Sequence, residues 1–60
     1  MLSFVVVFRE LSTGHLSTFR VKAHSEFHAH DEGRRALAAA HRNDFDIDAW
    51  VLFSCARCEP

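Results

Sequence analysis

Two stretches near the start of the chain have the hydrophobic pattern of β-strands. Residues 2–9 (LSFVVVFR) are apolar on both faces at the middle, which favours a central strand. In residues 15–24, apolar side chains at Phe19, Val21 and Ala23 alternate with polar ones, as expected for a half-buried edge strand. The segment between them, residues 10–14, ends in Gly14, which accommodates the positive φ of a tight turn. The two strands are therefore expected to form an antiparallel hairpin.

A helix is expected after the second strand. Ser25 is a favourable N-cap, and Glu26 follows in the first turn, where the helix dipole stabilises an acid. Helical spacing continues to about His41, and Asn43 suits a left-handed residue beyond the helix end. One stripe of this helix consists mostly of small residues: Ala29, Gly33, Ala36, Leu37 and Ala40. A glycine in a helix costs about 1 kcal/mol relative to Ala, and close packing of this stripe on the sheet would offset that cost.

The last strand-like run, residues 50–55, is apolar on both faces. Phe45 and Ile47 have the same parity as Val51 and Phe53, so this strand is expected to begin early. A right-handed crossover makes the third strand parallel to the second, with the first strand between them. The fold prediction is α+β, of ββαβ order: a three-stranded antiparallel sheet (order 2-1-3) with one helix packed on one face. We expect residues 1–60 to form a single small domain, with residues 56–60 as a flexible tail.

One helix covers only one face of such a sheet, so the other face is expected to remain open. The covered face is predicted to carry Phe4, Val6, Phe8, Phe19, Val21, Val51 and Phe53. The predicted open face, read as an interface, comprises Val5, Val7, Leu16, Thr18, Arg20, Trp50 and Leu52. Burying its central apolar side chains would contribute about 1.5–3 kcal/mol each. The first functional hypothesis is a small non-enzymatic protein-interaction module that forms a homodimer through this face, with another protein as the alternative partner.

Composition and charge support a globular domain and narrow its partners. Hydrophobic residues make up 48% and charged residues 25% of the chain, which argues against disorder. The formal net charge of −1 provides no long-range attraction to nucleic acid or to an anionic membrane. Trp50 beside Arg9, Arg20 and Lys22 nevertheless suits base stacking, so a weak single-stranded nucleic-acid binder is a further alternative. The first apolar run is too short to span a membrane and has no basic segment before it, so a cytoplasmic location is expected.

Cys55 and Cys58 form a single C-x-x-C motif. Two thiolates at this spacing can chelate zinc, and histidines would have to complete a structural site. The predicted topology brings the start of the helix to the same end of the sheet as Cys55. The second functional hypothesis is therefore a small zinc-binding protein, with the ligands Cys55, Cys58, His28 and His24, and His30 as a further candidate. The competing interpretation is that Cys55 packs inward, Cys58 lies on the tail and no cofactor binds.

The sequence does not indicate catalysis. A chain of 60 residues leaves little room for a substrate pocket of several hundred Å³, and no glycine-rich phosphate loop is present. The C-x-x-C ends a strand, whereas redox motifs of the thioredoxin kind open a helix. Residues 44–48 begin like a calcium loop, but Ala49 and Cys55 stand where the loop requires Gly and Glu. We therefore expect no enzyme activity.

Overall fold

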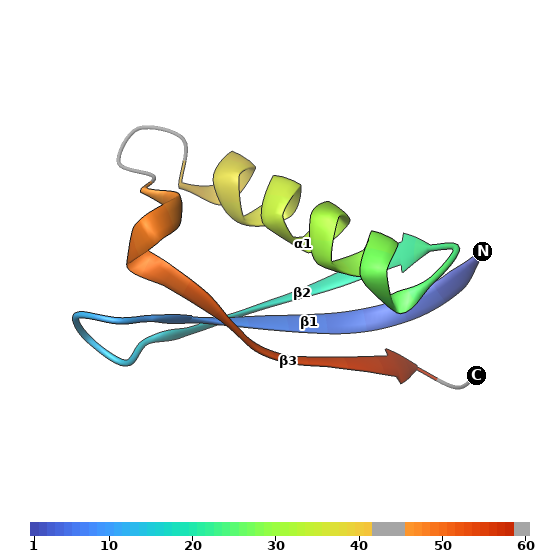
Figure 1. The fold of residues 1–60 in the computed structure, drawn as a ribbon, viewed down its shortest axis with the longest axis horizontal. Helices are drawn as coiled ribbons and strands as arrows, with labels where there is room; N and C mark the ends of the chain where they lie inside the picture. Colours follow the sequence, from blue (N-terminus) through green and yellow to red (C-terminus); the bar gives the residue numbers. More distant parts are fainter. Residues whose placement is uncertain (42–45, 59–60) are drawn as a thin grey trace.

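Three strands and one helix make up the fold in the computed structural model, which describes residues 1–41 and 46–58 (Figure 1). The elements are β1 (Leu2–Glu10), β2 (Leu16–Ala23), α1 (Glu26–Ala40), the short 3-10 helix η1 (Ile47–Ala49) and β3 (Trp50–Cys58). The sheet order is β2-β1-β3, and both neighbouring pairs are antiparallel. The helix lies over one face of this sheet (Figure 1). This arrangement confirms the predicted ββαβ fold.

The hairpin between β1 and β2 has the expected turn. Gly14 adopts a φ of 76°, a left-handed conformation that glycine reaches without a steric penalty. Its N–H donates a hydrogen bond to the carbonyl oxygen of Glu10 at 2.8 Å, which closes the turn. From this turn the ladder extends over the length of both strands, as far as the pair Leu2 and Ala23.

Helix α1 approaches β1 closely because one of its residues has no side chain. Three members of the predicted stripe, Ala29, Gly33 and Leu37, are buried, whereas Ala36 is half-buried and Ala40 is exposed. A Cβ atom placed on Gly33 would lie 2.8 Å from Cγ1 of Val6 and 3.2 Å from Cε2 of Phe8. Only hydrogen fits in this space, so the distance between helix and sheet depends on Gly33.

A β-bulge interrupts the pairing of β1 with β3. Val7 pairs with Ser54, but the next β1 residue, Phe8, pairs with Leu52. Phe53 is therefore the extra residue of the bulge. The alternation of faces along β3 changes at this point, so that Trp50, Leu52 and Cys55 all pack against the buried core.

The β3 residues that precede the bulge also lie on the faces opposite to those predicted. Trp50 and Leu52 lie on the helix side and not on the predicted open face, whereas Val51 and Phe53 are exposed and not covered. Ile47 belongs to η1, and this turn breaks the parity that the prediction extended from Ile47 into the strand. The expected helix stop at Asn43 and the early strand start at Phe45 lie outside the described residues.

The end of β3 also corrects the prediction of a flexible tail. The strand continues to Cys58, which pairs with Ser3 of β1. Residues 56–58 are therefore part of the sheet, and residues 59–60 lie outside the described range. The strand thus passes through both cysteines of the C-x-x-C motif.

Replacing Gly33 with Ala is expected to destabilise the fold, although Ala is the better helix former. The added methyl group would overlap Val6, and overpacking of this kind typically lowers the free energy of unfolding by about 1–3 kcal/mol. Urea denaturation would measure the loss. In a Val6→Ala background the same substitution should cost less, because Cγ1 of Val6 is gone. An equal cost in both backgrounds would contradict a direct overlap.

Candidate functional site

Three potential metal ligands meet where the first turns of α1 lie beside β3. Glu26 and His30 are four residues apart on α1, so they share one face of the helix. Cys55 faces them from β3, because its ladder partner Val6 points toward the helix. One ligand atom from each of these three side chains lies within 4.8 Å of the other two. In residues 1–41 and 46–58, this is the one cluster of at least three such groups, and we call it the Glu26–His30–Cys55 cluster.

The imidazole of His30 contributes a buried nitrogen to this cluster. Its Nε2 atom is shielded from solvent and has no hydrogen-bond partner in the described structure. The Oε1 atom of Glu26 lies 4.0 Å away, which is too long for a hydrogen bond. Leaving such a polar atom buried without a partner costs about 1–3 kcal/mol. The cluster therefore contains a nitrogen whose hydrogen-bonding capacity is not used.

The thiol of Cys55 is half-buried, and its environment disfavours the charged form. Burial is the main cause that raises its pKa above the ordinary value, and the negative charge of Glu26 adds to the rise. A thiol with a raised pKa is neutral and weakly nucleophilic at neutral pH. A bound cation would reverse this preference, because it stabilises the thiolate.

The second cysteine does not join Cys55. Cys58 pairs with Ser3 and Cys55 with Val6, and these two β1 residues point to opposite faces of the sheet. Three steps along a strand also separate the two cysteines by about 10 Å. The structure thus corrects the predicted chelation by Cys55 and Cys58. The motif lies within an extended strand, where two residues three apart cannot bind the same metal ion.

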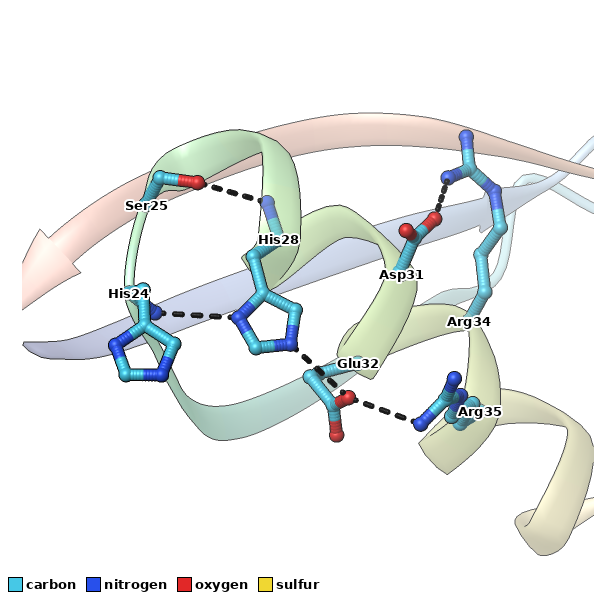
Figure 2. A network of polar contacts seen from close by, with 7 residues as sticks. All are labelled: His24, Ser25, His28, Asp31, Glu32, Arg34 and Arg35. Atoms are coloured by element: carbon cyan, nitrogen blue, oxygen red, sulfur yellow. Dashed lines mark hydrogen bonds and ion pairs between the residues drawn. The ribbon is translucent and has the colours of Figure 1, made fainter. Parts of the chain in front are cut away.

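The ring of His28, another predicted ligand, makes polar contacts at the start of the helix (Figure 2). Its Nδ1 accepts a hydrogen bond from the backbone N–H of His24 at 3.2 Å, and its Nε2 lies 3.4 Å from Oε1 of Glu32. The hydroxyl of Ser25 accepts a hydrogen bond from the N–H of His28 at 3.2 Å, as expected of the N-cap. The rings of His24 and His28 are stacked, with centroids 5.6 Å apart. Both ring nitrogens of His28 are therefore engaged, and neither His24 nor His28 belongs to the cluster around Cys55.

The sheet face opposite α1 is a second candidate site, and we call it the open face. Residues paired across an antiparallel ladder share a face, so the register identifies its members. They are Ser3, Val5, Val7 and Arg9 of β1, Leu16, Thr18, Arg20 and Lys22 of β2, and Val51, Ser54, Ala56 and Cys58 of β3. Leu16, Val51 and the bulge residue Phe53 beside Ser54 are 47%, 41% and 59% exposed. Val51 and Phe53 thus provide the apolar surface that was expected from Trp50 and Leu52.

The charges of the open face are all of one sign. Arg9, Arg20 and Lys22 lie on it, and none of the strand residues assigned to it is acidic. The net charge of the whole chain is −1, so the face is more basic than the chain average. Acidic side chains are found instead on α1, where they form ion pairs within the helix (Figure 2). Oδ1 of Asp31 lies 3.7 Å from Nη1 of Arg34. Oε1 of Glu32 lies 3.2 Å from Nη1 of Arg35.

Comparison with known proteins assigns no family to the chain. No protein-family model, curated protein or solved structure matches it. Among the described residues, no helix combines the length and the apolar character that crossing a membrane requires. The residues that bear on function are therefore those of the Glu26–His30–Cys55 cluster and of the open face.

Replacing His28 with Ala is expected to lower the free energy of unfolding by about 1 kcal/mol. The substitution removes the acceptor for the His24 N–H and the contact with Glu32, and the loss of one such bond has roughly this effect. Thermal unfolding followed by circular dichroism would measure the change. His15→Ala is the matched control, because His15 is exposed in the hairpin region. Equal losses for the two variants would contradict a specific role of His28.

The raised pKa of Cys55 predicts how stability depends on pH. The pKa of this thiol in the folded state lies above the ordinary value of 9.0. Its contribution to the free energy of unfolding is therefore fully present below pH 9.0 and is lost as the pH rises through the folded-state pKa. The free energy of unfolding of the parent chain should therefore fall relative to that of Cys55→Ser above pH 9.0. Cys58→Ser should follow the parent. A constant difference between the parent and Cys55→Ser across this range would count against the raised pKa.

Proposed function

We propose that this chain is a small non-enzymatic interaction module that forms a homodimer through its open face. The observation that carries the proposal is the unequal covering of the sheet: α1 packs on one face, and the other presents apolar side chains to solvent. Leu16, Val51 and Phe53 are exposed there, and Val5 and Val7 on the central strand are half-buried. Removing apolar surface from water is favourable by about 25 cal/mol per Å². A contiguous exposed patch of this kind is typical of an interaction surface.

The size of the open face suits a reversible dimer. Three strands about 4.8 Å apart, with about eight residues each at roughly 3.3 Å per residue, give a footprint of roughly 14 by 26 Å. Protruding side chains make the accessible area larger than this footprint. Two such footprints total roughly 730 Å², which is below the lower limit of specific interfaces, about 1,200 Å² in total, and only the protruding side chains reduce the difference. We therefore expect dissociation at low concentration and not an obligate dimer.

The register favours one symmetric arrangement of two copies. A twofold axis parallel to the strands places β2 of one copy over β3 of the other, with β1 over β1. Leu16 then lies over Val51 of the second copy, because both pair with Arg9 in their own sheets. By the same reasoning Arg20 lies over Ala56, since both pair with Val5. Apolar residues therefore meet apolar residues, and the Arg20 cation meets a small side chain.

A twofold axis across the strands would be less favourable. It stacks β2 on β2, so the cations Arg20 and Lys22 of both copies lie on two facing strands. In the favoured arrangement only Arg9, on the central strand, stays near its own symmetry mate. Its guanidinium leans toward the hairpin turn, where a Cβ on Gly14 would lie 3.7 Å from it. Some repulsion between the two copies therefore remains, and dissolved salt would screen it.

A nucleic-acid partner is less well supported than a second copy. The basic side chains of the open face and the exposed ring of Phe53 would suit a single strand. However, Trp50, the ring expected to stack on bases, packs on the helix side with its centroid 5.2 Å from that of His41. The aromatic ring that remains on the open face for stacking is therefore that of Phe53.

Sedimentation velocity over a range of concentrations, up to about 1 mM, tests the proposal. We expect the average mass to rise from monomer to dimer, and the dimer to become tighter as salt increases, because the facing charges are alike. Phe53→Lys should weaken dimerisation at least tenfold. Phe27→Lys is the matched control, because Phe27 is an exposed ring on α1, away from the open face, and it should leave dimerisation unchanged.

Three results would contradict the homodimer. The first is a monomer at every concentration, and the second is a dimer that Phe53→Lys and Phe27→Lys affect equally. The third is binding of a fluorescent single-stranded oligonucleotide that weakens steeply with salt and with Phe53→Lys, which would favour the nucleic-acid alternative.

A further inference from the structure

We propose that Glu26, His30 and Cys55 form a binding site for a transition metal ion of the zinc class. The proposal is independent of the homodimer, because the cluster lies on the helix side of the sheet and all three residues belong to one copy. It also differs from a site built on the C-x-x-C motif, since Cys58 points to the opposite face.

The chemistry of the three ligands selects the class of ion. They offer a carboxylate oxygen, an imidazole nitrogen and a sulfur, which together suit Zn²⁺ and Co²⁺. Ca²⁺ and Mg²⁺ prefer oxygen ligands throughout and would use only Glu26. Coordination by Cys55 replaces the thiol proton, so each bound ion releases one proton to solvent. The fourth position of a tetrahedral ion would remain available to water or to an external ligand.

The distances require only a small adjustment on binding. Ligand atoms around one tetrahedral zinc stand roughly 3.5 Å apart, given bond lengths of about 2.0–2.3 Å. The three atoms here lie within 4.8 Å of one another, so they must approach by about 1 Å. The side chain of Glu26 is 67% exposed and can rotate to close this gap. His30 and Cys55 are half-buried on two packed elements and supply the more rigid part of the site.

The buried nitrogen of His30 is a second observation that favours this cluster. Its Nε2 atom has no hydrogen-bond partner within the described residues, whereas the ring nitrogens of His28 are both engaged. A metal ion at the cluster would bind this nitrogen of the neutral ring. It would also join the first turns of α1 to the edge strand β3, so binding should stabilise the folded chain.

Titration of the reduced chain with Co²⁺ tests the site directly. We expect one ion per chain, with an absorption band in the near ultraviolet from charge transfer between thiolate and cobalt, and loss of this band on adding Zn²⁺. Cys55→Ser should abolish the band, and His30→Gln and Glu26→Gln should each weaken binding at least tenfold. Cys58→Ser and His15→Gln are the matched controls and should bind like the parent, with circular dichroism showing that each variant is folded.

Thermal unfolding in Zn²⁺ provides a second readout. At a free concentration of about 100 times Kd, binding to the folded state alone shifts the unfolding equilibrium about 100-fold. This shift should be absent in Cys55→Ser and retained in Cys58→Ser. The proposal is overturned if no charge-transfer band develops at millimolar Co²⁺, if Cys58→Ser removes the band, or if Cys55→Ser is stabilised by Zn²⁺ as much as the parent.

Discussion

The contact between Gly33 and Val6 determines where the helix lies, and both candidate sites depend on it. With no side chain at Gly33, α1 rests directly on β1, and a Cβ there would come within 2.8 Å of Val6. The first turns of the helix are thereby held against the sheet near Cys55, which brings Glu26 and His30 within reach of its sulfur. The same packing commits the helix to one side of the sheet and leaves the other side uncovered.

Most of the fold was predictable because its signals are local. Ser25 as N-cap and Gly14 in the turn each have a physical reason that does not depend on distant parts of the chain, and the structure confirms both. The small residue at Gly33 was predicted from the helical spacing of its stripe, and its close contact with β1 confirms the reason given for it. The faces of β3 could not be predicted in this way. Residues 50–53 are all apolar, so no alternation with polar residues shows which of them face the core. The positions of η1 and of the bulge at Phe53 determine this instead.

The candidate site was predictable in part. Cys55 and the early helix were correctly placed at the same end of the sheet, and His30 was among the candidates. The four-residue spacing of Glu26 and His30 indicates a shared helix face, but the strand residue opposite them depends on the bulge. Cys58 was assigned from the spacing of the C-x-x-C motif, and His28 from its place at the start of the helix. Their other roles, in a ladder pair and in a hydrogen bond to His24, follow from backbone geometry that composition and spacing do not specify.

The bulge in β3 also affects how the sheet ends. An edge strand has a row of backbone groups that can pair with another chain, and a long, flat, apolar edge invites uncontrolled aggregation. β3 has nine residues and is rich in apolar side chains, so it is exposed to this hazard. The extra residue at Phe53 interrupts the regular spacing of its donors and acceptors and increases the local twist. A foreign strand would meet this irregularity along the edge of β3, and such bulges disfavour continuous edge-to-edge pairing.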